Sequence, residues 1–106
     1  MAKKKNKKTI LGFDTVEVLG HTFRIIETDN DAILLDGGRN VALGFVKYFD
    51  SLIVIDSRQS KQSMMQTFYH ELLHAIDWIS HNEQIAYDEE TVNVLGRGLA
   101  TVKLGK

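Results

Sequence analysis

The sequence has no cysteine, and it has no apolar run long enough to span a bilayer. The absence of cysteine excludes disulfides and thiolate metal sites. A membrane helix needs about 20 consecutive apolar residues. The basic start at residues 1–8 is not followed by the apolar segment that a secretion signal requires. We therefore expect a cytoplasmic protein that does not associate with membranes.

The 106 residues suffice for one domain with a single core. We expect a disordered basic tail at 1–8 and one domain over 9–106. The tail holds five of the thirteen Lys and Arg residues, and the remainder carries eight basic against fourteen acidic residues. Because the tail has no aromatic residues and the body is negative, nucleic acid is not the expected partner. A nucleic-acid accessory factor acting through the tail stays open as an alternative.

The first half of the chain shows the two-residue period of strands. Residues 16–18 and 23–25 alternate apolar and polar side chains around Gly20-His21, which predicts a hairpin with His21 in the turn. Asp29-Asn30-Asp31 predicts a turn, and residues 33–35 a short strand.

Two further apolar runs, at 41–49 and 52–55, meet around Asp50-Ser51 and predict a second hairpin. Residues 52–55 are apolar at every position, so this strand should be buried on both faces or shielded by the helices. Because the strands precede the helices, the predicted class is α+β: a mainly antiparallel sheet followed by two long helices.

A helical period begins near Ser60, which can cap a helix that we expect to end at 80–82. One side of this helix is apolar and should pack on the core: Met65, Phe68, Leu72, Ala75, Ile76 and Ile79. The other side is polar and should be left free: Thr67, His70, His74 and Asp77.

The polar side carries the pattern His70-Glu71-Leu72-Leu73-His74, which is the His-Glu-x-x-His of zinc-dependent peptidases. Its four-residue spacing places the two imidazoles side by side, where they can share a tetrahedral zinc ion. Glu71 lies beside them as a candidate general base toward a metal-activated water. Two core histidines satisfied by hydrogen bonds are the alternative. Trp78 lies on the Glu71 side, either as a cleft wall or as half-buried packing.

A zinc ion held by two histidines needs a third protein ligand. Asp77 and Ser80 occupy the positions that a glycine and a third histidine take in metzincins. The alternative is a carboxylate from the helix that opens at residues 88–90, after a loop at 81–86.

Helical phase discriminates between the two glutamates of this second helix. Its expected buried stripe consists of Val92, Leu95, Gly96, Leu99 and Val102. Glu89 lies toward this stripe and Glu90 points away from it, so Glu89 is the predicted ligand. Gly96 should let the two helices approach closely. Arg97 is expected to pair with Glu90 or Asn93 and has no predicted catalytic role.

The chain resembles the gluzincin metallopeptidases in their smallest form. Such proteins combine His-Glu-x-x-His with Glu-x-x-(Ala/Ser)-(Asp/Asn) on the next helix, and residues 89–93 look like this second signature with valine in the small position. Residues 69–99 also resemble small metallopeptidase-like proteins of bacteriophages and, more distantly, repressor-cleaving peptidases of mobile elements. The resemblance covers residues 60–102. It implies that Glu89 is the third ligand and that Asn93 steadies a ligating histidine.

The pattern and the resemblance together predict a zincin-like, endopeptidase-like enzyme that acts on peptide or protein substrates. Zn²⁺ would be held by His70, His74 and Glu89, with Glu71 as the general base. The resemblance also implies a substrate-pairing edge strand, sought in the 41–55 hairpin, and a His or Tyr that binds the oxyanion. For this last role the candidates Tyr69, His81 and Tyr87 stay open. The small size and the unassigned oxyanion donor favour the alternative, a zinc-stabilised binding or regulatory protein without significant turnover.

Overall fold

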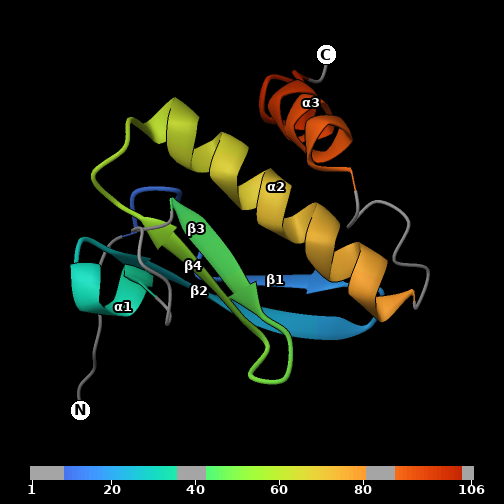
Figure 1. Cartoon of the computed structure of the whole chain (residues 1–106), viewed down its shortest axis with the longest axis horizontal. Coiled ribbons are helices and arrows are strands. Elements are labelled where there is room, and N and C mark those ends of the chain that lie inside the picture. The colour runs from blue at the N-terminus through green and yellow to red at the C-terminus, as the bar shows by residue number, and fades with distance from the viewer. Residues whose placement is uncertain (1–8, 36–42, 81–87, 104–106) are drawn as a thin grey trace.

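The computed structural model describes residues 9–35, 43–80 and 88–103. The predicted tail at 1–8 and the predicted loops around 36–40 and 81–86 lie outside these ranges, as do His81 and Tyr87. The described elements are β1 (Thr15–Val18), β2 (His21–Thr28), α1 (Asp31–Leu35), β3 (Gly44–Lys47), β4 (Leu52–Asp56), α2 (Lys61–Ile79) and α3 (Glu89–Ala100). The four strands precede the two long helices, with only the short α1 between β2 and β3, so the fold is α+β, as predicted (Figure 1). None of the helices in these ranges has the length and apolarity needed to cross a membrane.

The four strands form one sheet in the order β1-β2-β4-β3. The β1–β2 and β3–β4 pairs are antiparallel, so both predicted hairpins are confirmed. The β2–β4 pair is parallel, which makes the sheet mixed but mostly antiparallel. The prediction of a mainly antiparallel sheet is therefore confirmed, and β3 lies at one edge.

The turn of the first hairpin differs by one residue from the prediction. Leu19 and Gly20 both have positive φ, at 50° and 82°, as the central residues of a tight two-residue turn require. His21 pairs with Val18 and is the first residue of β2. Its prediction as a turn residue is wrong, because the two central residues of the turn are Leu19 and Gly20 and not Gly20 and His21.

The predicted strand at residues 33–35 is wrong, because Asp31–Leu35 forms the short helix α1. The backbone N–H groups of Ile33 and Leu34 donate to the carbonyl of Asn30, at 3.0 and 3.1 Å. The Asn30 side chain also accepts a hydrogen bond from the N–H of Ala32 at 2.9 Å. The predicted turn at residues 29–31 is therefore followed directly by a helix, because the Asn30 side chain satisfies a free backbone amide at the start of that helix.

The core lies between the sheet and α2. Ile53, Val54 and Ile55 of β4 are at most 1% exposed, which confirms a strand buried on both faces. Ile53 and Ile55 belong to a buried cluster with side chains of β2 and α2. Val54 faces the other side because side chains alternate along a strand. Helix α1, with its fully buried Leu34, contacts β4.

Helix α2 lies across one face of the sheet (Figure 1). The Ser60 hydroxyl accepts from the N–H of Ser63 at 3.1 Å, and Ser80 caps the other end, so both predicted ends are confirmed. The predicted apolar side packs on the core, with Phe68 and Ala75 buried. Trp78 stacks on Tyr48, with ring centroids 5.0 Å apart. Its role is therefore half-buried packing at the β3–β4 turn.

Helix α3 begins at the predicted position, where the Asp88 side chain accepts from the N–H of Thr91. It packs against α2, and α2 lies between it and strands β1 and β2 (Figure 1). Val92 and Gly96 are buried as predicted. The rest of the predicted stripe is wrong, since Leu95, Leu99 and Val102 are 42%, 41% and 60% exposed. A helix that packs on a single partner buries a narrower face than one that is covered from two sides.

One ion pair gives a pH-dependent contribution to stability. Asp56, which is 5% exposed, accepts hydrogen bonds from the Arg58 Nε and Nη2 at 3.0 and 2.9 Å, and Arg58 also reaches Asp31 on α1 at 2.8 Å. The Arg58 hydrogen bond lowers the pKa of Asp56 below its usual 3.8, although burial acts in the opposite direction. The charged carboxylate therefore stabilises the fold above the ordinary pKa, and this contribution is lost as the pH falls through the lowered value.

We expect Asp56→Asn to lower the melting temperature by several degrees at pH 7, because it removes the charge from a hydrogen-bonded pair. The difference from wild type should shrink as the pH falls below 4, where the wild-type carboxylate is itself neutralised. Thermal unfolding of both proteins between pH 7 and pH 3 measures this. A difference that stays constant over the range would contradict the assignment.

Candidate metal centre

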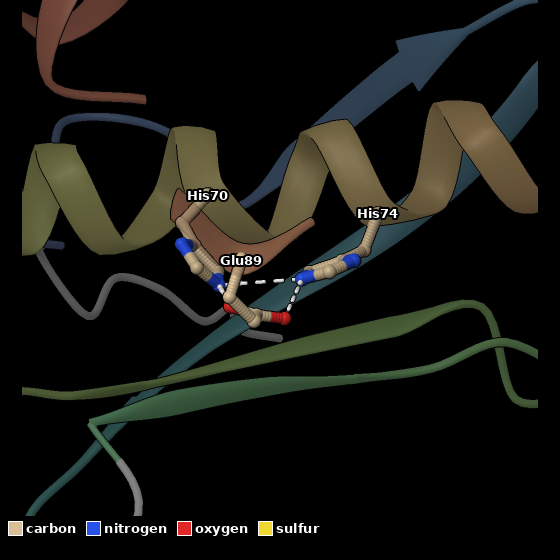
Figure 2. Close-up of side chains that lie close together, drawn as sticks. All are labelled: His70, His74 and Glu89. Atoms are coloured by element: carbon tan, nitrogen blue, oxygen red, sulfur yellow. Dashed lines mark hydrogen bonds and ion pairs between the residues drawn. The ribbon is translucent and has the colours of Figure 1, made fainter. Parts of the chain in front are cut away.

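Three side chains from two helices converge on one point. His70 and His74 project from neighbouring turns of α2, and Glu89, the first residue of α3, extends its carboxylate between them (Figure 2). The Nε2 of His70 lies 3.1 Å from one carboxylate oxygen, and the Nε2 of His74 lies 3.1 Å from the other. The two Nε2 atoms are 3.2 Å apart. The structure thus brings together all three ligands predicted from the sequence.

These separations fit a tetrahedral metal ion. Two ligand atoms bound to zinc at about 2.0–2.1 Å, with a tetrahedral angle between them, lie roughly 3.3–3.4 Å apart. The observed 3.1–3.2 Å is close to that spacing, and all three residues offer ligand atoms within 4.8 Å of one another. The donor set of two imidazoles and a carboxylate is also one that zinc prefers.

The alternative of two hydrogen-bonded histidines explains this arrangement less well. Each imidazole could donate its Nε2 proton to Glu89, which accounts for two of the three short contacts. Both Nε2 atoms would then be donors facing each other at 3.2 Å, where neither offers the other an acceptor. A cation at the common point makes all three contacts favourable.

The surroundings keep His70 in the form that can bind a metal. Burial lowers its pKa, and the neighbouring His74 lowers it further, while Glu89 and a hydrogen bond with Asn93 act in the opposite direction. A neutral imidazole carries the free lone pair that a metal needs. The contact with Asn93 also lies where the resemblance implies a residue that steadies a ligating histidine.

Glu71 lies on the turn of α2 between the two histidines, yet it is not one of the converging groups. It is only 8% exposed, and burial, with a smaller contribution from the charge of Glu89, raises its pKa to about 7. Together with His70 it lines a pocket of about 390 Å³. Because this carboxylate lines the pocket and is not one of the three converging groups, it is available to exchange protons with a molecule bound there.

Family models, curated proteins and solved structures give no match to this chain. The chemistry of the site is therefore inferred from its own residues and geometry.

Two glycines set how closely the neighbouring elements approach α2. A Cβ on Gly96 would lie 3.2 Å from the backbone nitrogen of His70, so α3 touches the backbone of α2 at the metal turn. A Cβ on Gly44 would lie 2.5 Å from the Thr67 side chain and 3.7 Å from the Cγ of Glu71. The absence of side chains at these positions brings Glu89 within reach of the histidines and places β3 beside Glu71.

Gln59 ties this edge strand to the metal helix. Its Nε2 donates to the carbonyls of Leu43 and Asp56, at 3.3 and 2.9 Å, and its Oε1 accepts from the Thr67 hydroxyl at 3.0 Å. The side-chain amide therefore holds the start of β3, the end of β4 and α2 together. Sequence reasoning missed this clamp, because no motif marks a glutamine that links three elements.

Other predicted positions fall outside the converging group. Asp77, expected on the free polar side of α2, is 3% exposed and is not part of the three-residue group. Tyr69 packs against the core and the ring of Phe68, so it does not line the pocket.

Arg97, which had no predicted role, lines the pocket. A signal was present in the sequence, since Asn93 and Arg97 follow Glu89 at four-residue steps on one side of the helix.

The Gly96 contact gives a matched pair of variants. Gly96→Val forces side-chain atoms against the backbone of α2, so α3 should shift and carry Glu89 away from the histidines. We expect zinc affinity to fall by about tenfold or more, as for loss of a contact that orients a ligand.

Gly98→Val is the control, because a Cβ at that position meets nothing within 4 Å. It should keep wild-type zinc affinity and lose no stability, since valine is a better helix former than glycine. Competition titration with a chromogenic chelator measures both affinities. Equal affinities for the two variants would show that the Gly96 approach does not position Glu89.

Proposed function

We propose that the protein is a zinc-dependent, zincin-like peptidase that hydrolyses peptide bonds within peptide or protein substrates. The observation that carries this proposal is the convergence of His70, His74 and Glu89 at 3.1–3.2 Å, with the buried Glu71 lining a pocket together with His70. His70, His74 and Glu89 would hold the ion and leave a fourth position open, as in catalytic zinc sites. The predicted cytoplasmic location belongs to the same proposal.

The chemistry assigned to each residue follows from its place. A zinc ion, when bound, acidifies a water and polarises a carbonyl group. Glu71 accepts a proton from the attacking water and passes it to the amine that leaves when the C–N bond breaks. Asn93 keeps His70 in orientation through their hydrogen bond.

The position of β3 supports an extended peptide as the substrate. Within the described sheet, β3 pairs with β4 on one side and forms an edge on the other. Leu43 and Gly44, at its start, line the same pocket as Glu71. An exposed strand edge offers backbone donors and acceptors to a second extended chain. This strand belongs to the 41–55 hairpin, where the substrate-pairing strand implied by the resemblance was sought.

A second function has one observation in its favour. Among the described residues that line the pocket there is no tyrosine, and His70 is the only histidine. A donor that stabilises the transition-state oxyanion is therefore unassigned, which favours a zinc-stabilised binding or regulatory protein of the same fold.

One experiment separates the two functions. Zinc-reconstituted protein is incubated with unfolded proteins and a peptide mixture, and newly formed chain ends are identified by mass spectrometry. New ends that disappear when a chelator is added support the peptidase. A protein that retains zinc and is fully folded but produces no new ends fits the regulatory function instead.

A further inference from the structure

The pocket extends away from the metal centre along the first turns of α2. His70 and Glu71 line it at the metal turn, Thr67 lines it one turn earlier, and Ser63 lines it two turns earlier. The volume of about 390 Å³ falls within the range of small-molecule and peptide side-chain sites. The site therefore offers room for a portion of substrate that is not itself cleaved.

Arg97 supplies the positive charge of this pocket. Among the described lining residues it is the only Lys or Arg, and apart from His70 and Glu71 the others are uncharged. Its predicted pairing with Glu90 is not formed, because no carboxylate of the described residues lies within ion-pair distance of Arg97. Arg97 is exposed, and it has no anionic partner within the described ranges.

The spacing between Glu89 and Arg97 along α3 suits a peptide. Arg97 follows Glu89 by eight residues, which corresponds to about 12 Å along a helix axis. An extended peptide advances about 3.3–3.6 Å per residue. Glu89 and Arg97 are therefore separated along α3 by about the length of three extended peptide residues.

We propose that Arg97 binds a carboxylate of the substrate, so that the pocket selects peptides with a negative charge about three residues from the cleaved bond. A guanidinium matches a carboxylate with two parallel N–H···O hydrogen bonds, and such charge-assisted pairs are stronger than neutral ones. The carboxylate belongs either to the free C-terminus of a short peptide or to an acidic side chain. This inference rests on the proposed peptidase function, because it assigns a substrate class to the same site.

Binding of labelled peptides tests the inference without depending on turnover. Three versions of one eight-residue sequence are compared by fluorescence anisotropy, using zinc-reconstituted Glu71→Gln protein: a free C-terminal acid, a C-terminal amide, and an amide with internal glutamates. We expect at least one carboxylate-bearing version to bind about tenfold more tightly than the neutral amide, as for a charge-assisted pair. A preference for the free acid identifies the C-terminus, and a preference for the glutamate version identifies an acidic side chain.

Variants at Arg97 decide whether this residue is responsible. Arg97→Ala should abolish the preference, and Arg97→Lys should keep part of it, because lysine retains the charge without the fork of donors. Arg24→Ala, which removes an exposed cation on β2 outside the pocket, should keep the full preference. Zinc content and circular dichroism verify that each variant is folded. Equal binding of the three peptides, or a preference that survives Arg97→Ala, would overturn the inference.

The inference and the peptidase proposal fail in different ways. If wild type cleaves peptides while the three versions bind equally, the peptidase stands and the role of Arg97 is wrong. If no peptide is cleaved but the preference depends on Arg97, the pocket binds carboxylates in a protein without turnover.

Discussion

Glu71→Gln is expected to leave zinc binding and the fold intact and to reduce peptide hydrolysis by about a hundredfold to ten-thousandfold, the usual contribution of a general base. Glutamine has the size of glutamate and can still hydrogen-bond a water molecule, but it cannot accept the proton of that water. Glu71 is 8% exposed and lines the pocket with His70, and it is not one of the three converging groups. A replacement of equal size should therefore change proton transfer and leave zinc binding intact. The loss should appear in kcat.

The control for this variant is Glu90→Gln, which removes the charge of an exposed glutamate on α3. It should hydrolyse peptides at the wild-type rate. Rates measured with one fluorogenic peptide, together with zinc content, give the comparison. Residual activity of Glu71→Gln above roughly a tenth would mean that another group is the base. Loss of zinc from this variant would instead make Glu71 a ligand.

Glu89→Ala should weaken zinc binding far more than Glu90→Ala, although the two glutamates are adjacent. The carboxylate of Glu89 lies 3.1 Å from both histidine nitrogens, whereas Glu90 is not part of the converging group. Loss of an orienting contact around a metal typically costs about 10–100-fold in affinity. Removal of one of three direct ligands should exceed that range, and Glu90→Ala should stay near wild type.

Competition with a chelator of known zinc affinity measures both variants and wild type under the same conditions. The Asp88 cap is untouched in either variant, so the start of α3 should be preserved in both. Similar affinities for the two variants, or a weaker Glu90→Ala, would show that zinc binds elsewhere or with a different third ligand.

Local signals predicted the elements that position the site. Helix α2 begins and ends where the sequence indicated because its first turn is capped by Ser60 and its apolar period is long. The strand at residues 33–35 failed because three apolar residues carry too little periodicity, and the hydrogen bonds of Asn30 decided in favour of a helix.

The arrangement of the two hairpins was beyond local signals. The uniform apolarity of β4 indicated a buried strand, and β4 is buried between β2 and β3 in the sheet. Its parallel pairing with β2 joins segments that are far apart in the sequence. An antiparallel neighbour would have satisfied the same apolar pattern, so the sequence alone could not select between them.

Within the site, helical phase placed Glu89 rather than Glu90 toward the histidines, and in the structure it is Glu89 that contacts His70 and His74. The same phase failed for Leu95 and Leu99, which are more than 40% exposed. Periodicity gives the direction of an apolar face but not how many neighbours cover it. Arg97 was missed because its pocket is formed by α2, α3 and the start of β3 together.

The most direct test of the metal centre is the zinc content of the full chain after reconstitution and removal of unbound metal, measured by elemental analysis beside a His70→Ala/His74→Ala double variant. If His70, His74 and Glu89 hold the ion, the wild-type protein should retain one zinc per chain and the double variant none. A folded wild-type protein that retains no more zinc than the double variant would contradict the metal centre and the function proposed from it.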